Sequence, residues 1–297
     1  MTLIEPKQIF YKKTNVVYPP FKNGLYMEEY FFNKFLKENP KTKRKYIPAF
    51  WTNFQIEDSF YSNRNIIQNY LNQWIHKNPS KNGYFTIVQH DDSVLLQLPP
   101  NTIIYGACSG NIPLPLIYED KNNTLENIQK LNFNQKQILC SFVGSITPTH
   151  IIPNVRTIMI DYFKNNKKFI LNYNNQWTDN VNINNQNNFI NTTLNSKFAL
   201  APRGYGRSSF RFFEILKLET VPIYIWNDIE WLPYKDEIDY SKFSISINIR
   251  EIHKLEYILL NITEEQYNNM IQEYKNIKHK LSLEGMYNYV IKKELES

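Results

Sequence analysis

The fold of this chain is decided by residues 197–248, which read KFALAPRGYGRSSFRFFEILKLETVPIYIWNDIEWLPYKDEIDYSKFSISIN. Apolar runs at residues 198–202, 221–225 and 243–247 are separated by a glycine-spaced basic turn, a mixed run and a loop around Trp-Leu-Pro. This order predicts a strand, a glycine turn, a helix, a second strand, a loop and a third strand. A glycine turn between a strand and a helix lies where a doubly wound α/β domain holds phosphate groups.

The chemistry of this turn favours an anionic ligand. Gly204 and Gly206 let a ligand approach the backbone closely. Either of two serines can cap the predicted helix, whose N-terminal N–H groups and dipole attract negative charge. Arginines within and just after the turn supply forked donors for phosphate oxygens. We therefore expect a site for an anion formed by Arg203, Gly204, Tyr205, Arg207, Ser208, Ser209 and Arg211.

The predicted helix carries an arginine and a glutamate three residues apart, Arg211 and Glu214. Residues at this spacing share one helix face. Arg211 is then placed to bind a diphosphate, and Glu214 to accept hydrogen bonds from ribose or sugar hydroxyls. The alternative is an ion pair on the surface, which contributes little. The glycine turn, the serines and the flanking strands favour the binding interpretation.

Several segments resemble the exostosin family of glycosyltransferases. Residues 196–205 read SKFALAPRGY and residues 209–215 read SFRFFEI, followed by VPIYI at 221–225 and LP at 232–233. They are similar to the family's S-K-F-C-L-x-P-x-G, S-x-R-x-x-E-A, V-P-V-I and L-P-F segments. Alanines stand in place of the usual cysteines, and an isoleucine replaces the small residue after the glutamate. These departures concern packing and leave the arginine and the glutamate in place.

Two further blocks support the resemblance. Residues 139–145, LCSFVGS, followed by Arg156, are similar to the family's F-x-G block and its downstream arginine. Residues 84–91, YFTIVQHD, resemble the H-F-F-V-x-x-x-D segment of the N-terminal half. The clear match covers residues 139–250.

The resemblance implies an α/β protein of GT-B type, with two facing Rossmann-like domains and a cleft between them. It implies an inverting transfer of a sugar from a UDP-sugar donor to a glycan or glycoside acceptor, with no cofactor and no obligatory metal. Arg211 and Glu214 match the positions that contact the nucleotide, and Arg156 matches a second diphosphate ligand. Among the sugars that relatives transfer, xylose and galactose are favoured here.

An inverting transfer needs a base that takes the proton of the acceptor hydroxyl. The resemblance of residues 84–91 favours Asp91 as this base, with Asp92 as the neighbouring candidate. Both follow a predicted buried strand, where chain ends of a parallel sheet reach a ligand. The alternative is that the two aspartates only open a solvated turn. Adjacent carboxylates on an extended chain point to opposite faces, so the pair is not a D-x-D metal site.

The pattern along the chain divides it into residues 1–135, residues 136–262 and a C-terminal helical segment, 263–297. The resemblance implies that the first is an acceptor-side α/β domain, that the second is a nucleotide-sugar-binding α/β domain, and that the third packs back on the first domain. Residues 172–188 are rich in asparagine and are expected to form an exposed loop, with a short helix after it. The expected helices are 28–37, 63–76, 155–163, 189–194 and 263–280, and the expected strands include 84–89, 101–105, 136–143 and 168–172.

Bulk composition leaves two other classes of function open. The 34 Lys and Arg outnumber the 28 Asp and Glu, for a net charge of +6, so a nucleic-acid-binding protein has to be considered. No zinc-finger spacing, RNA-binding aromatic motif or basic zipper accompanies the charge, and we expect no nucleic-acid partner. A non-catalytic module that binds a sugar nucleotide or a glycan is the second alternative. With 2 cysteines, a secreted disulfide scaffold is not expected.

No signal peptide or membrane anchor is visible in the sequence, and no membrane span is expected. We therefore expect a cytoplasmic protein. The abundance of Asn, Lys, Ile and Tyr indicates an AT-rich coding genome, which points to a large DNA virus or a protist as the source. For a virus, the location would be the host cytoplasm.

Overall fold

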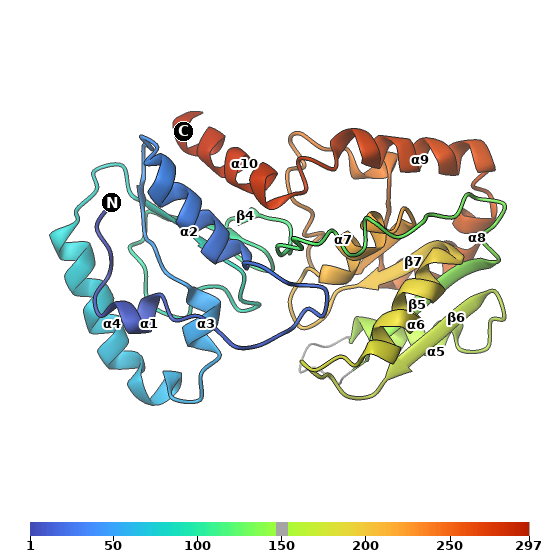
Figure 1. The fold of residues 1–297 in the computed structure, drawn as a ribbon, viewed down its shortest axis with the longest axis horizontal. Helices are drawn as coiled ribbons and strands as arrows, with labels where there is room; N and C mark the ends of the chain where they lie inside the picture. Colours follow the sequence, from blue (N-terminus) through green and yellow to red (C-terminus); the bar gives the residue numbers. More distant parts are fainter. Residues whose placement is uncertain (147–153, 297) are drawn as a thin grey trace. The chain divides into compact units, whose positions relative to one another are not determined.

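The computed structural model describes residues 1–146 and 154–296, and it divides into two compact units (Figure 1). Unit 1 consists of Met1–Val16, Gly24–Glu119 and His279–Ser297, and unit 2 of Val17–Asn23 and Asp120–Lys278. The division after Glu119 falls earlier in the chain than the expected boundary at residue 135. The segment Val17–Asn23 also leaves the N-terminal unit to join unit 2, which local sequence patterns do not show.

Unit 1 is built on a parallel sheet of four strands in the order β1-β2-β3-β4. The strands are β1 (Lys45–Tyr46), β2 (Tyr84–Val88), β3 (Thr102–Gly106) and β4 (Ile112–Pro113). All five residues of β2 are buried, as expected for a central parallel strand covered on both faces. The helices are α1 (Lys7–Phe10), α2 (Met27–Glu38), α3 (Trp51–Gln55), α4 (Phe60–Lys77) and α10 (Leu283–Glu296).

Helix α10 packs on α2 and completes unit 1. The rings of Phe31 and Tyr287 lie 5.2 Å apart. Glu294 is fully buried, and its carboxylate accepts hydrogen bonds from Arg44 at 3.2 Å and from the hydroxyl of Tyr105 at 2.7 Å. Helix α9 (Glu264–Ile277) belongs to unit 2, so the expected C-terminal segment 263–297 is divided between the units.

Unit 2 contains a parallel sheet of five strands in the order β6-β5-β7-β8-β9. The strands are β5 (Ile138–Ser145), β6 (Phe169–Asn174), β7 (Ser196–Pro202), β8 (Val221–Trp226) and β9 (Ile245–Asn248). The chain starts at β5, moves outward to β6 and then returns past β5 to β7. The direction of winding therefore reverses between β5 and β7, which is where doubly wound sheets bind ligands.

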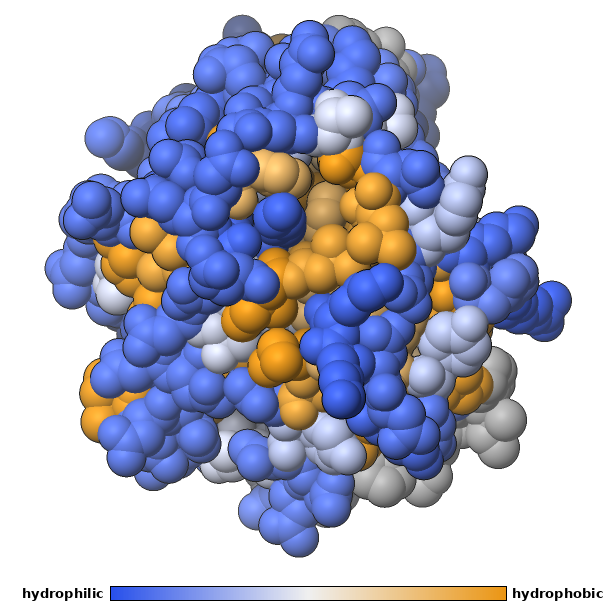
Figure 2. Space-filling model, turned by 90° about the vertical axis from the view of Figure 1, so that its right-hand side faces the viewer, coloured by the Kyte–Doolittle hydropathy of each residue, from blue (hydrophilic) through white to orange (hydrophobic). Residues whose placement is uncertain are grey.

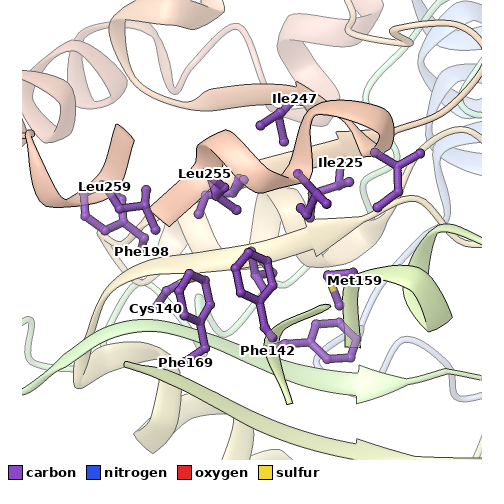
Figure 3. Close-up of a cluster of buried hydrophobic side chains, with 14 of the residues drawn as sticks. Cys140, Phe142, Met159, Phe169, Phe198, Ile225, Ile247, Leu255 and Leu259 are labelled. Carbon is purple, nitrogen blue, oxygen red and sulfur yellow. The ribbon is translucent and has the colours of Figure 1, made fainter. Parts of the chain in front are cut away.

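The helices of unit 2 follow its strands in alternation, as a doubly wound fold requires. They are α5 (Val155–Phe163), α6 (Ile183–Leu194), α7 (Phe210–Lys217), α8 (Leu255–Leu260) and α9, with two 3-10 turns, η1 (Tyr240–Lys242) and η2 (Ile249–Lys254). The apolar core between the sheet and these helices joins Phe142, Phe198 and Leu255, among others (Figure 3). Phe163 and Phe169 stack in it with ring centroids 3.9 Å apart.

The expected exposed loop over residues 172–188 is confirmed for residues 175–182 and corrected on both sides, because β6 extends to Asn174 and α6 begins at Ile183. Asn182 caps the helix, since its side chain accepts a hydrogen bond from the N–H of Asn185 at 2.9 Å. Phe189 and Leu194 are buried and anchor the helix on the sheet. The helix is six residues longer at its start than the expected 189–194, because asparagines that suggest a loop also fill its exposed first turns.

The face of the molecule at the α8 and β6 end carries apolar side chains within hydrophilic surroundings (Figure 2). The strand β6 lies at the edge of the sheet, and Ile170 and Tyr173 on it are 38% and 42% exposed.

None of the helices in the described residues is long and apolar enough to cross a bilayer. The expected α/β class with two Rossmann-like halves is confirmed, and the facing of the halves across a cleft stays a prediction.

Candidate functional site

A cavity of about 490 Å³ lies in unit 2 at the carboxyl ends of β5 and β6. It is formed by the segment before residue 24, by the ends of these two strands, by the residues leading into α6, and by α7. Its volume is in the range of pockets that bind small molecules. The lining residues are Tyr18, Pro20, Phe21, Val143, Gly144, Ser145, Leu171, Asn172, Tyr173, Asn174, Gln176, Trp177, Thr178, Val181, Asn185, Gln186, Asn188, Phe189, Arg211 and Glu214.

Helix α7 brings the predicted arginine and glutamate to this cavity. Ser209 is its N-cap, and its hydroxyl accepts a hydrogen bond from the N–H of Arg211 at 3.3 Å. Phe212 and Phe213 are buried on the side of the helix that faces the core. The remaining face presents Arg211 and Glu214 to the cavity, as the three-residue spacing predicts.

The pair of Arg211 and Glu214 is held on several sides. Nη1 of Arg211 lies 3.2 Å from Oε2 of Glu214, whose side chain is 5% exposed. The guanidinium also lies over the ring of Phe189, 3.7 Å from its centroid. The burial of the glutamate excludes the alternative of a solvated surface pair. The arginine is therefore oriented before any ligand arrives, which lowers the entropic cost of binding an anion.

The two arginines of the glycine turn, Arg203 and Arg207, form ion pairs and do not line the cavity. Arg203 is 5% exposed, and it forms an ion pair with Asp228 and donates to Oδ1 of Asn227 at 2.8 Å. Nε of Arg207 donates to the other carboxylate oxygen of Asp228 at 2.8 Å. Neither arginine lines the cavity. A carboxylate after β8 holds both guanidinium groups, and binding of the donor by Arg203 and Arg207 stays a prediction.

The surroundings of Asp228 keep its carboxylate ionised, so that it can pair with both arginines. Partial burial acts to raise its pKa, but hydrogen bonds from the N–H of Ile229 and from Arg207, together with the charge of Arg203, lower it to about 2. Asp228 is therefore ionised at neutral pH and ties the end of β8 to the turn after β7.

Arg156 connects the ends of β5 and β7. Asn154 caps α5 by accepting hydrogen bonds from two backbone N–H groups, one of them that of Arg156 at 3.2 Å. The guanidinium donates to the carbonyl of Ser145 at 2.6 Å and to that of Arg203 at 3.2 Å. A Cβ on Gly204 would lie 3.2 Å from Nη2 of Arg156, so glycine leaves room for this guanidinium. Arg156 thus supports the cavity through Ser145, which lines it.

The other predicted residues of the turn lie outside the cavity. Tyr205 is 43% exposed, and its carbonyl accepts a hydrogen bond from Arg203 at 2.9 Å. Ser208 is half-buried and precedes the capping residue. Of the predicted donor-binding residues, only Arg211 and Glu214 line the cavity directly.

Sequence reasoning missed the part of the site contributed by the segment Val17–Asn23. The ring of Tyr18 lies edge-on to those of Trp177 and Phe210, with centroids 5.3 Å and 6.0 Å away. Burial raises the pKa of Tyr18, and the charge of Glu214 raises it further. No local signal in the sequence shows that this segment reaches a cavity formed by residues more than a hundred positions later.

The candidate bases lie at the carboxyl end of β2 in unit 1. Asp91 and Asp92 are both exposed, in a turn that begins after the buried strand. The Nδ1 of His90 accepts a hydrogen bond from the N–H of Asp92 at 3.1 Å. Burial lowers the pKa of His90 against the influence of the two aspartates. The turn is solvated, as the alternative interpretation states, and its position at the strand end also fits the predicted role.

A buried carboxyl group next to this turn was not predicted. Glu28, at the start of α2, is 2% exposed and accepts hydrogen bonds from the N–H of Gln89 at 2.7 Å and from the hydroxyl of Thr52 at 2.7 Å. Burial raises the pKa of Glu28 to about 7, although these hydrogen bonds act to lower it. The sequence signal is weak, because a glutamate in the first turn of a helix is common on the surface.

Within residues 1–146 and 154–296, no group of three or more histidine, cysteine, aspartate or glutamate side chains is arranged to hold a metal ion. Both cysteines are buried free thiols. The requirement of the reaction for a metal is a separate question, and metal independence stays a prediction.

A parallel sheet with a cavity at the carboxyl ends of β5 and β6, lined by an arginine and a glutamate, defines an α/β protein with a candidate ligand site at the carboxyl edge of its sheet. The family follows from the sequence match. Residues 105–262, more than half of the chain, match the Exostosin GT47 domain, and the chain belongs to this family of glycosyltransferases. The match contains Arg156, Arg211 and Glu214 and leaves out both Asp91 and the segment 17–23.

Curated relatives agree with this assignment. A probable glycosyltransferase of Arabidopsis thaliana is 29% identical over 124 residues, which are 42% of this chain and 25% of the relative. The Exostosin-1 homolog of Caenorhabditis elegans is 25% identical over 184 residues, which are 56% of this chain and 48% of the relative. The match therefore spans from a quarter to about half of the length of these relatives.

Two solved structures resemble the chain more distantly. TarM aligns with a TM-score of 0.36 at 11% identity, over 70% of this chain and 54% of TarM. An α1,3-fucosyltransferase aligns with a TM-score of 0.36 at 17% identity, over 75% of this chain and 80% of that enzyme. At this distance the two structures carry no argument about the site.

Proposed function

We propose that this chain is an inverting glycosyltransferase that moves a sugar from a UDP-sugar to a hydroxyl group of a glycan or glycoside. The observation that carries the proposal is the cavity of unit 2, with Arg211 and Glu214 presented by the first turns of α7. Membership of the exostosin GT47 family supports it.

The residues of the cavity suit the two ends of a nucleoside diphosphate. Arg211 donates to the diphosphate, and Glu214 accepts hydrogen bonds from ribose hydroxyls. Arg156, whose guanidinium donates a hydrogen bond to the carbonyl of Ser145, adds positive charge to the same edge of the sheet. Negative charge on the departing UDP grows as the bond to the sugar breaks, so a fixed cation stabilises the transition state more than the bound donor.

The proposed transfer needs one base, which takes the proton of the acceptor hydroxyl. The acceptor oxygen attacks C1 of the sugar from the face opposite to the diphosphate and loses its proton to Asp91. The bond from C1 to the phosphate oxygen breaks, and its electron pair leaves with UDP. A single displacement of this kind inverts the configuration at C1, and we propose that it proceeds without an obligatory metal or cofactor.

The finer points of the proposal stay predictions. They are xylose or galactose as the transferred sugar, an acceptor bound by unit 1, a cytoplasmic location and a viral or protist source. None of them changes the role proposed for Arg211 and Glu214.

A thermal-shift panel tests the proposal first. The full chain is melted with UDP, GDP, dTDP, CMP and several UDP-sugars, each with and without EDTA. A ligand that binds only the folded state raises the melting temperature. Stabilisation by UDP and by one UDP-sugar, unchanged by EDTA, would support the proposal and identify the donor. No shift with any nucleotide would overturn the donor site.

The two alternatives give different results in the same experiment. A non-catalytic sugar-nucleotide module would be stabilised by UDP but would show neither transfer nor slow hydrolysis of the donor. A nucleic-acid-binding protein would bind an oligonucleotide with an affinity that falls steeply with salt and that UDP does not compete for.

A further inference from the structure

The segment Val17–Asn23 is part of the cavity of unit 2, although the residues on both sides of it belong to unit 1. It contributes Tyr18, Pro20 and Phe21 to the cavity wall. The ring of Phe21 lies 6.0 Å from that of Phe189, the residue under the guanidinium of Arg211. This wall lies outside the 105–262 family match, so the family relationship assigns it no role.

Tyr18 and Trp177 form an aromatic pair at the cavity. Their ring centroids are 5.3 Å apart with an interplanar angle of 71°. Trp177 is nevertheless 54% exposed. A tryptophan that is held in place while more than half of it faces solvent, on the wall of a cavity, presents a large rigid surface to a planar ligand.

The rest of this wall is neutral and rich in side-chain amides. Asn174 and Gln176 precede Trp177, and Asn185 and Asn188 follow on α6. Each amide offers both a donor and an acceptor. The polar edge of a pyrimidine or purine alternates donors and acceptors in the same way, and amide side chains pair with such edges.

The aromatic pair lies next to the charged residues of α7. Phe210, whose ring lies 6.0 Å from that of Tyr18, is the first residue of α7, and Arg211 follows it directly. Arg211 and Glu214 both act on the titration of Tyr18. The aromatic pair and the cationic end of the cavity are therefore neighbours within one enclosure.

We infer that Trp177, held by its edge contact with Tyr18, stacks its exposed ring on the nucleobase of the donor, and that the amide-bearing residues 174–188 recognise the polar edge of that base. The inference rests on the proposed function, because the donor is taken to be a nucleotide. It assigns a specificity role to Tyr18, which lies outside the family match, and to Trp177, which lies within the match but in none of the motif segments.

Calorimetric titration of the full chain with UDP tests the proposed stacking of the nucleobase on Trp177. Base stacking on an aromatic side chain corresponds to a change of about 5- to 150-fold in affinity, so Trp177→Ala should weaken UDP binding by that factor. Trp177→Phe, which keeps a flat ring, should restore most of the affinity. Tyr257→Ala is the matched control, because this aromatic residue of α8 is 74% exposed and does not line the cavity.

Three outcomes separate the inference from the function on which it rests. If wild-type protein binds UDP and Trp177→Ala binds it with unchanged affinity, the stacking on Trp177 is overturned. The proposed function stays intact in that case. Weaker binding of the UDP-sugar but not of UDP would show that the ring contacts the sugar, which also overturns the nucleobase assignment. Wild-type protein that binds no nucleotide would overturn the proposed function itself.

Discussion

The carboxyl edges of the two sheets carry opposite charge. In unit 2, arginines gather where β5 and β7 end, at Arg156, Arg203, Arg207 and Arg211. In unit 1, the residues at the end of β2 include two aspartates, and Glu28 lies behind them. The same architecture thus offers one edge that suits an anionic ligand and one edge whose carboxylates can accept a proton. Charge at the edge, rather than the fold, distinguishes the two halves.

The two edges also differ in how firmly their side chains are held. The arginines of unit 2 are fixed by carboxylates, carbonyls and an aromatic ring. Asp91 and Asp92 are exposed in a turn. A preorganised edge is what the stabilisation of a leaving group requires, whereas a base can be oriented by the acceptor that it deprotonates.

The largest expected effect lies in the acidic edge. Asp91→Asn removes the proposed base and should lower the rate of transfer by about 10²- to 10⁴-fold, while UDP-sugar affinity stays unchanged. Steady-state kinetics and calorimetric titration of the donor measure the two quantities. Asp92→Asn is the matched control and should retain activity. If the activity is lost in Asp92→Asn instead, the neighbouring carboxylate is the base.

The cationic edge is tested by Arg211→Ala. Loss of one fixed donor to a developing negative charge lowers turnover by about 10²- to 10³-fold, and we expect an effect of this size here. Donor affinity should fall too, because the arginine also binds the ground-state diphosphate. Arg250→Ala, an exposed arginine of the same unit, is the control. Wild-type turnover in a folded Arg211→Ala protein would refute the assignment.

The buried carboxyl of the acidic edge predicts a dependence of stability on pH. The pKa of Glu28 is raised to about 7 from 4.5, so the folded state retains a proton that the unfolded state releases. Stability should therefore fall as the pH rises from 4.5 to 7, by on the order of 3 kcal/mol for this group. Urea denaturation at pH 5 and pH 8 measures it.

Glu28→Gln should remove that part of the pH dependence. The difference in stability between the variant and the wild type should then change with pH in the predicted direction. Glu265→Gln, an exposed glutamate of α9, controls for the loss of a charge. Parallel pH profiles for wild type and Glu28→Gln would contradict the prediction.

The smallest effect concerns the carboxylate that holds the two structural arginines. Asp228→Asn should cost about 1–2 kcal/mol of stability, a figure reduced from that of a fully buried pair because the aspartate side chain is 40% exposed. Its pKa is lowered to about 2, so its contribution is complete above pH 4 and is lost as the pH falls through 2. Asp58→Asn, an exposed aspartate, should leave acid unfolding unchanged.

Local features of the site could be predicted from the sequence. Ser209 caps α7, and Arg211 and Glu214 share a face, because capping and helical spacing depend on residues a few positions apart. The bounds of α5 were predicted to the residue, Val155–Phe163. The α/β class and the family could also be read, since both depend on the order of elements and motifs.

Features that depend on distant residues could not be predicted. The ion pairs of Arg203 and Arg207 with Asp228, more than twenty positions later, do not follow from the local sequence. Tyr18 reaches the cavity through a segment whose pattern shows only an extended chain. Both outcomes are set by tertiary contacts, which override local expectations about charge and exposure.

The division of the chain has a consequence for synthesis on the ribosome. Residues 17–278 contain all of unit 2, and α10 follows them. The half with the cavity can fold as soon as its residues have emerged, whereas unit 1 waits for α10 to cover α2 and bring Glu294 to Arg44. The nascent protein therefore completes unit 2, which contains the cavity, before unit 1.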